Sequence, residues 1–356
     1  MRVEVAPGET LRATLPDALG QQLYLLADCT DANTCVAGAT ADGGPGEVVW
    51  TNTSGGVESW SLVVDGGGDL PTPVYRVDIG FETLPAVGAV DDCAAMLAST
   101  PVTTGQFAGV DLSGFADDLD PGAAGCTGAD LAGPDAMLPI QLQAGELMWA
   151  QAVGVDALYT VTDCLDPATC EDTSSLWSHR PTVVSRNDTG ATLDLGLIAD
   201  TATVGGGWSI EVAIGPEVTF APADDCAAAA ALPSIQTGRS LGFGDLAGFT
   251  NQIDPGAVGC TGAPALGGEG IVPVALNPGE TVRARVNQLG GDGALYVLSD
   301  CANTATCLVG DDQFGATGDW PEEVQWTNDT GIATTVWLVL DGYGQTGEFF
   351  ADVEVY

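Results

Sequence analysis

Three stretches of the chain, at residues 23–35, 158–170 and 295–307, read LYLLADCTDANTC, LYTVTDCLDPATC and LYVLSDCANTATC. Each is a short, mainly apolar run that ends in Asp-Cys, and a second cysteine follows six positions after the first. The first cysteines, Cys29, Cys164 and Cys301, are 135 and 137 residues apart. A period of this length is that of a whole domain rather than of a solenoid repeat. The sequence therefore predicts copies of one domain in tandem.

Further matches flank these stretches and set the domain boundaries. Upstream lie APGETLRATL (6–15), QAGELMWAQA (143–152) and NPGETVRARV (277–286), and downstream lie WTNTSGG (50–56), SRNDTGA (185–191) and WTNDTGI (326–332). Asp65, Asp200 and Asp341 then open Gly-rich loops. DDCAA (91, 224) and DPGA-x-GCTGA (120, 254) occur only twice. We expect a partial repeat at 1–82, complete repeats at 89–215 and 223–356, and Pro-containing linkers at 82–90 and 215–223.

The composition indicates an all-β fold. The chain has 49 Gly and 20 Pro, and its apolar runs are short, alternating and separated by Pro-Gly, Asn-Asp and Asp-Gly turns. Seven or eight such strands in each repeat are typical of an antiparallel β-sandwich. The helical candidates are short Ala-rich turns, for which Asp92 and Asp225 are the expected N-caps.

The charge excludes several partners. There are 49 acidic residues against 8 arginines and no lysine, which gives a formal net charge of −41. Such a polyanion repels nucleic acid and anionic lipid, and no apolar run is long enough for membrane insertion. Asp recurs at matched turns, so much of the charge follows from turn chemistry. Salty extracellular water would screen the remaining self-repulsion, and we expect stability to fall at low ionic strength.

The 10 cysteines favour disulfides over zinc, because the chain has one histidine and no C-x2-C pair. Disulfides place the chain outside the cytoplasm. Repeat one lacks positions equivalent to Cys93 and Cys126, so the simplest pairing that leaves no cysteine unpaired is local. It joins Cys29–Cys35, Cys164–Cys170, Cys301–Cys307, Cys93–Cys126 and Cys226–Cys260.

The pattern resembles the bacterial pre-peptidase C-terminal (PPC) domain. The similar features are the DxC opening, the PGE turn and strand, the D-x-LY-L-x-DC…C strand and loop, and the terminal hairpin at 62–79 and 338–355. Repeat two departs from them with Ser185-Arg186 in place of Trp-Thr and with LGL at 195–197. The resemblance implies tandem antiparallel jelly-roll-like β-sandwiches, stabilised by disulfides, that act as a non-catalytic module of a secreted bacterial protein.

Calcium is the cofactor that the acidic loops suggest, because hard cations prefer clustered carboxylate and carbonyl oxygens. The candidate ligands are Asp117, Asp118 and Asp120, with Asn251 and Asp254 at the matching place in repeat three. None has the spacing of an EF-hand loop. The alternative is that these residues form solvated turns and helix caps.

Catalysis is not expected. A Ser-His-acid triad would need His179, which occurs in one repeat and without a G-x-S-x-G motif. The tryptophans at matched positions, Trp50 with Trp326 and Trp60 with Trp337, suit core packing or carbohydrate binding. The triplets that begin at Asn52, Asn187 and Asn328 match glycosylation acceptors, but turn chemistry explains them equally well.

Three functions follow from these features. The first is a structural or adhesive protein at the cell surface or in an extracellular fibre. The open sheet edges of the partial repeat would be completed by upstream sequence or by strand donation from another chain, which would build a head-to-tail filament. The second is a set of accessory domains of a secreted hydrolase that bind calcium, glycan or protein. The third, an enzyme in its own right, would depend on His179.

Overall fold

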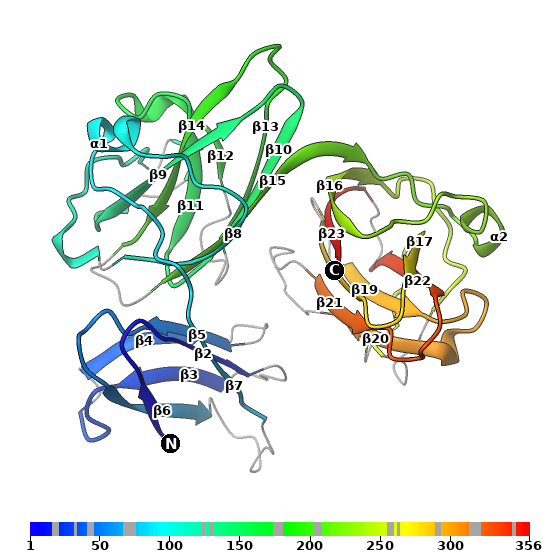
Figure 1. Cartoon of the computed structure of the whole chain (residues 1–356), viewed down its shortest axis with the longest axis horizontal. Coiled ribbons are helices and arrows are strands. Elements are labelled where there is room, and N and C mark those ends of the chain that lie inside the picture. The colour runs from blue at the N-terminus through cyan, green and yellow to red at the C-terminus, as the bar shows by residue number, and fades with distance from the viewer. Residues whose placement is uncertain are drawn as a thin grey trace. The chain divides into compact units, whose positions relative to one another are not determined.

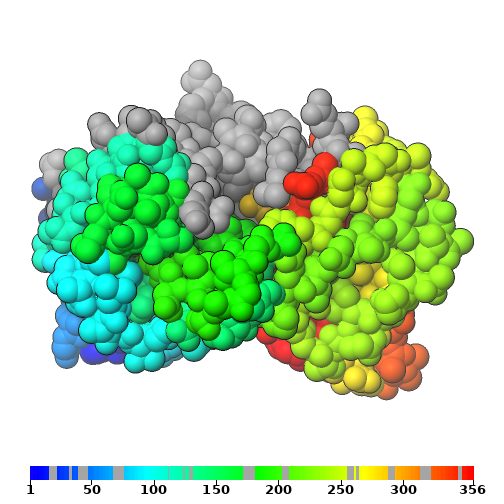
Figure 2. Space-filling model, turned by 90° about the horizontal axis from the view of Figure 1, so that it is seen from above, coloured from blue at the N-terminus to red at the C-terminus, as the bar shows by residue number. Residues whose placement is uncertain are grey.

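The fold is described from a computed structural model of the 356-residue chain (Figure 1). The structure describes all residues except 16–20, 32–33, 41–45, 67–75, 111, 123–124, 128–130, 174–180, 203–207, 255–259, 262–263, 289–292, 313–321 and 344–346, which are grey in the space-filling view (Figure 2). The chain divides into two compact units, Met1–Ile214 and Gly215–Tyr356. Within the described residues, no helix is long and apolar enough to cross a membrane.

Repeat two consists of two antiparallel sheets. One has the order β12-β11-β14-β9 and the other contains β13, β10, β15 and β8 in that order. The alternating sequence produces them, since the inward side chains of both sheets meet in one core. The elements are α1 (Cys93–Ala98), β8 (Gly105–Ala108), η2 (Leu112–Gly114), β9 (Asp135–Leu142), β10 (Glu146–Val153), β11 (Ala157–Val161), η3 (Pro167–Thr169), β12 (Cys170–Thr173), β13 (Thr182–Arg186), β14 (Leu193–Asp200) and β15 (Ser209–Thr219).

Repeat three has the same topology. Its sheets have the orders β17-β22-β19-β20 and β16-β23-β18-β21. Every strand of repeat two from β8 to β15 has a counterpart here, from β16 to β23. The elements are α2 (Cys226–Ala229), β16 (Gly238–Asp245), β17 (Gly270–Leu276), β18 (Thr281–Gln288), β19 (Gly293–Leu298), η4 (Thr304–Thr306), β20 (Cys307–Asp311), β21 (Glu322–Thr327), β22 (Thr334–Gly342) and β23 (Glu348–Val355).

Repeat one is a smaller sandwich. Its sheets have the orders β1-β6-β3-β4 and β5-β2-β7, formed by β1 (Arg2–Val5), β2 (Thr10–Leu15), β3 (Gln21–Leu26), β4 (Cys35–Thr40), β5 (Gly46–Thr51), β6 (Glu58–Gly66) and β7 (Asp78–Glu82). These strands match β9 to β15. Among the described residues, repeat one has no counterpart of α1 and β8, or of α2 and β16. The predicted all-β sandwich class is confirmed.

Each repeat has its own core between the two sheets. In repeat one Leu11, Leu23 and Leu25 are fully buried. In repeat two the core is built around Leu138, Leu158 and Trp208, and in repeat three a separate core includes Val274, Leu295 and Phe349. The division into three domains and its boundaries stay a prediction.

The predicted helix caps are confirmed. The side chain of Asp92 accepts a 2.8 Å hydrogen bond from the Ala95 N–H, and Asp225 accepts one of the same length from Ala228. Both caps have the extended backbone that an N-cap requires.

The linker sequences take part in the sandwich that follows them. Ala86 forms a parallel bridge with Ala108 of β8, and residues 217–219 at the end of β15 pair in parallel with residues 241–243 of β16. Gly242 permits this approach, because a Cβ there would lie 1.6 Å from the carbonyl oxygen of Val218. Each linker strand is therefore held by backbone hydrogen bonds.

Candidate functional site

In repeats two and three the outer face of one sheet is covered by a segment that precedes it in the sequence. We call residues 91–134 and 224–268 the cover segments. In repeat two, Met96, Leu119 and Leu131 of the cover segment pack on Tyr159 and Ile198 of the sheet. This second core lies on the opposite side of the sheet from the first one. In Figure 1, α1 lies beside β9 and β14.

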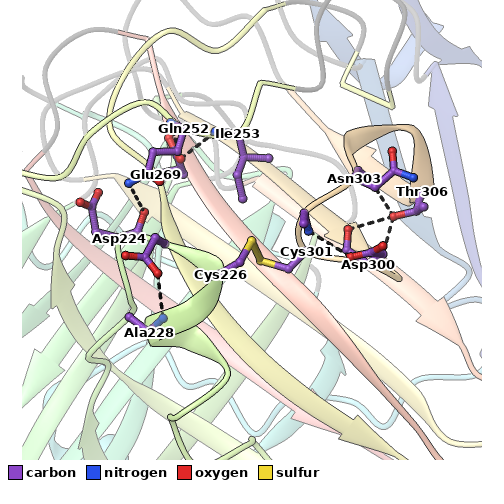
Figure 3. The surroundings of a disulfide bond; sticks show 12 residues. Asp224, Cys226, Ala228, Gln252, Ile253, Glu269, Asp300, Cys301, Asn303 and Thr306 are labelled. Carbon is purple, nitrogen blue, oxygen red and sulfur yellow. Dashed lines mark hydrogen bonds between the residues drawn. A yellow bond between two sulfur atoms is a disulfide. The ribbon is translucent and has the colours of Figure 1, made fainter.

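Repeat three repeats the arrangement. Ala229 and Ile253 of its cover segment pack on Tyr296, Leu298 and Val339 of the outer sheet face. Figure 3 shows this region, with α2 joined through Cys226 to Cys301 at the end of β19. The second core therefore belongs to each complete repeat.

The disulfides join the cover segments to the sheets. Cys93 pairs with Cys164 and Cys126 with Cys170 in repeat two, and in repeat three Cys226 pairs with Cys301 and Cys260 with Cys307. The predicted local pairing is wrong at every position. Cys29 and Cys35 of repeat one are free and exposed.

The error has a physical cause. Hydrogen bonds already close the loop between the two cysteines of each C-x5-C stretch. In repeat three the Thr306 hydroxyl donates to the carbonyls of Asp300 and Asn303, and the Asn303 side chain caps η4 (Figure 3). The cysteines are thus available to the cover segment. The local pairing also assumed that no cysteine is left unpaired, and repeat one contradicts that assumption.

A buried tyrosine and two acids lie beneath the cover segment of repeat two. Asp135 and Asp200 are directly opposite each other on β9 and β14, and both are fully buried. Asp135 accepts backbone N–H bonds from Asp118 (2.9 Å) and Leu119 (2.7 Å), and the Tyr159 hydroxyl donates to the Leu119 carbonyl at 2.5 Å. Asp135 and Tyr159 therefore anchor the loop of the cover segment to the sheet.

Burial dominates the electrostatics of this group. Desolvation, together with the charge of Asp135, raises the pKa of Asp200 far above the ordinary range of a carboxyl. Desolvation also raises the pKa of Asp135, although its two backbone N–H donors oppose the shift. Each of the two carboxyl groups affects the pKa of the other across the strand pair, so the pair favours a single shared proton. One carboxyl oxygen of each, Oδ1, is buried without a hydrogen-bond partner.

Repeat three contains the same group with glutamate in place of one aspartate. Glu269 Oε1 accepts the N–H groups of Gln252 (2.6 Å) and Ile253 (2.8 Å), while its Oε2 is buried without a partner. The Tyr296 hydroxyl donates to Asp341 at 3.0 Å. Burial raises the pKa of Asp341 to about 7 and that of Glu269 above its usual range. From the sequence, Asp200 and Asp341 are expected to open Gly-rich loops, and Tyr159, Tyr296, Asp135 and Glu269 are not among the candidates. The signal that could have found them is the tyrosine that recurs in register with each aspartate.

In repeat one, no segment among the described residues covers the same face. Tyr24 and Asp65 occupy the positions of Tyr159 and Asp200, and their side chains lie 3.4 Å apart. Asp65 is exposed and Tyr24 is half-buried, whereas their counterparts in the other repeats are fully buried.

Some of the candidate calcium ligands make hydrogen bonds within the cover segments, and others act on neighbouring acids through their charge. Asp118 serves through its backbone N–H, and the Asn251 amide donates to the Ala265 carbonyl at 3.4 Å. Asp120 accepts the Gly122 N–H at 2.7 Å, and Asp117 lies close enough to Asp120 for its charge to contribute to a raised Asp117 pKa, after desolvation. Asp120 in repeat two and Asp254 in repeat three act electrostatically on the buried Asp200 and Asp341. Across the described residues, no three acidic, histidine or cysteine side chains form a group that could hold a metal ion.

The remaining candidates have structural roles or lie outside the described residues. Trp50 is buried and meets Trp60 edge to face with ring centroids 4.7 Å apart, which confirms core packing for this pair. Trp326 and Trp337 are partly buried against the two cores of repeat three. Asn52, Asn187 and Asn328 are fully buried and donate to two backbone carbonyls each, as turn chemistry requires. His179 lies outside the described residues.

Comparisons with known proteins do not assign a family. No family model and no curated protein matches the chain, so the resemblance to the PPC domain stays a prediction. Solved structures with partial similarity include an 11S globulin from Wrightia tinctoria (10% identity, 62% of this chain and 75% of that chain, TM-score 0.15). The insecticidal delta-endotoxin Cry8Ea1 from Bacillus thuringiensis (8%, 99% and 53%, TM-score 0.18) and an oxalate decarboxylase (9%, 72% and 74%, TM-score 0.16) are others. Similarity at this level carries no functional argument.

Proposed function

We propose that this chain is a non-enzymatic structural or adhesive protein of the bacterial cell surface or of an extracellular fibre. The observation that carries the proposal is the double attachment of each complete repeat. Its outer sheet face is both packed under a cover segment and joined to it by two disulfides. Serial domains built in this way suit a load-bearing or protease-resistant array.

The chemistry of the cysteines supports an extracellular location. Four disulfides that close intervals of 44 to 75 residues persist in an oxidising compartment and not in the reducing cytoplasm. In the chain-entropy model, each stabilises the fold by about 4 kcal/mol. The net charge of −41 keeps such an array soluble in salt water.

The test is the location and the mechanical role of the protein in its source cells. Antibody labelling of intact cells should detect the chain at the surface or in extracellular fibres, and a deletion strain should lose adhesion or fibre integrity. A cytoplasmic protein, or a deletion strain that loses a hydrolytic activity but no adhesion, would contradict the proposal. The second result, together with glycan or collagen binding on an array, would favour accessory domains of a secreted hydrolase.

Binding of calcium is a second candidate. No three acidic side chains of the described residues are grouped as metal ligands, so a calcium ion would have to take up the buried carboxyl oxygens in place of the proton that they share. Two carboxyl groups at the centre of each complete repeat leave Asp135 Oδ1, Asp200 Oδ1 and Glu269 Oε2 buried without a hydrogen-bond partner. A calcium ion takes carboxylate, carbonyl and water oxygens, and Asp120 or Asp254 lies close enough to add charge. Thermal melting in millimolar calcium and in chelator tests it. An upward shift that Asp200→Asn and Asp341→Asn together abolish would support calcium binding, and melting indifferent to calcium would exclude it.

A further inference from the structure

Repeat one differs from its neighbours in three ways, two on the outer face of the β1-β6-β3-β4 sheet and one at the edge of the β5-β2-β7 sheet. The two cysteines at its C-x5-C stretch are free, the Tyr24–Asp65 pair is open to solvent, and the outer edge of β7 pairs with no described strand. In repeats two and three the matching features are each satisfied by the cover segment. We infer that this face and edge of repeat one form a docking site for a polypeptide of the cover-segment type, which carries two cysteines and is supplied from outside these 356 residues.

The cysteines define the orientation of the occupant. In both complete repeats the first cysteine of the C-x5-C stretch pairs with the cysteine of the short helix, and the second pairs with the cysteine of the C-T-G loop. We therefore expect Cys29 to form a disulfide with the occupant's equivalent of Cys93, and Cys35 to form one with its equivalent of Cys126. Two attachment points with a fixed order exclude most unrelated thiol partners.

The apolar side chains on the outer face of the β1-β6-β3-β4 sheet match those that the cover segment buries in repeat two. Tyr24 and Val63 stand opposite each other on β3 and β6, as Tyr159 and Ile198 do on β11 and β14. Tyr159 and Ile198 are fully buried by the cover segment, while Tyr24 and Val63 are only half-buried. Gly38 gives a further match, because its counterpart Gly310 has the carbonyl oxygen and the sulfur of Cys260 within 2.9 Å of the Cβ position, whereas Gly38 faces only atoms of repeat one.

The free edge of β7 completes the site. Its counterparts β15 and β23 pair with β8 and β16, the first strands of the cover segments. In each pair, an acid on the last strand of the repeat accepts a hydrogen bond from a side chain on the first strand of the cover segment. Gln106 of β8 donates to Glu211 of β15 at 2.9 Å, and Arg239 of β16 donates to Asp352 of β23 at 2.7 Å. In repeat one the corresponding Asp78 is half exposed and pairs with Arg76 of its own repeat. The docking polypeptide therefore adds a strand to β7 and bears a Gln or Arg there.

A second copy of the chain does not supply the occupant. Both cover segments of the chain are disulfide-bonded within their own repeats, and donation would require two disulfides to open. This inference refines the expectation from the sequence that the partial repeat is completed by strand donation, and it rests on the proposed function for the extracellular, oxidising setting.

The test uses the whole chain and its own residues 85–134 as the probe. Alkylation under non-reducing conditions should first label Cys29 and Cys35 and no other cysteine. Isotope-labelled 85–134 is then added in a glutathione redox buffer. The expected product is a 1:1 adduct whose digest links Cys29 to the probe's Cys93 and Cys35 to the probe's Cys126, with at least a tenfold loss of thiol labelling.

Matched variants keep the result interpretable. Cys29→Ser with Cys35→Ser should give no adduct, and a probe with Cys93→Ser should retain only the link to Cys35. If the separate probe does not fold, residues 85–134 fused through a flexible linker to Met1 should form the same two links. A Cys29–Cys35 disulfide in the isolated chain, random pairing with the probe, or a disulfide-linked dimer of the chain would overturn the inference. Capture of the probe without any surface or fibre localisation would instead retain the docking site and remove the proposed function.

Discussion

The hydroxyl of Tyr296 donates a 3.0 Å hydrogen bond to Asp341, and both side chains are fully buried between the sheet and the cover segment of repeat three. Glu269 lies opposite Asp341 at the adjoining strand end and holds the cover segment through two backbone N–H groups. Burial, together with the charge of Glu269, favours the protonated form of Asp341, while the hydrogen bonds donated by the Gly342 N–H and the Tyr296 hydroxyl oppose it. The contact between the sheet and the cover segment of repeat three therefore depends on the protonation state of Asp341 and Glu269, and the free energy of unfolding should vary with pH.

We expect the stability of repeat three to fall as pH rises from about 4 to 7. Burial raises the pKa of Asp341 to about 7 from the ordinary value of 3.8, so in this pH range the folded state binds a proton that the unfolded state has released. The unfolding free energy then decreases with pH through that window. Asp341→Asn reduces this dependence to the part that comes from Glu269 and should stabilise the repeat by roughly 1–3 kcal/mol at pH 8 relative to wild type. Denaturant unfolding at a series of pH values measures it.

Repeat one provides the matched control. Asp65 occupies the position of Asp341 but is exposed. Asp65→Asn should leave the pH profile of unfolding unchanged. An equal response in both variants would mean that the effect comes from net charge and not from burial.

The fold was largely predictable from sequence, because the signals that determine it are local. Alternation produced the strands, Asp92 and Asp225 capped the helices as expected, and the buried Asn52, Asn187 and Asn328 form the recurrent turns. The disulfides were not predictable in the same way. Recurrence in register shows which residues are equivalent, but it does not show that α1 and the end of β11, 71 residues apart, meet in space. The buried acids were missed for a related reason, since Asp200 and Asp341 resemble turn residues until the cover segment is placed over them.

Gly242→Ala should destabilise repeat three by about 2–4 kcal/mol. A Cβ at residue 242 would lie 1.6 Å from the Val218 carbonyl oxygen. The atoms that it would meet are backbone atoms of Val218, which cannot move aside as a side chain can. The linker strand at 217–219 would have to separate from β16. Gly347→Ala is the control, because nothing lies within 4 Å of its Cβ position. Thermal unfolding of the two variants measures the difference, and equal melting temperatures would show that the linker strand is not held as described.

Replacing Cys226 and Cys301 together by Ala should lower the stability of repeat three by about 4 kcal/mol, because the disulfide closes an interval of 75 residues in the unfolded chain. Cys29→Ala with Cys35→Ala should cost almost nothing, since both cysteines are free and exposed. Calorimetry of the two double variants separates this arrangement from the local pairing. A stability loss of similar size in the Cys29/Cys35 variant would instead restore the local Cys29–Cys35 disulfide.

Salt should raise the melting temperature of the whole chain. Each arginine that the structure describes has an acidic partner within 4.0 Å. These attractive pairs are few beside the acid–acid repulsion of a chain with a net charge of −41, so salt screens more repulsion than attraction. Raising the salt from about 0.01 M to 0.15 M shortens the screening length from about 30 Å to 8 Å and suppresses repulsion between acids on different turns. We expect a rise of several degrees in sodium chloride at pH 8. The rise should be smaller at pH 4, where many surface carboxyls are neutral. A melting temperature that does not respond to salt at either pH would mean that the acidity has no effect on stability.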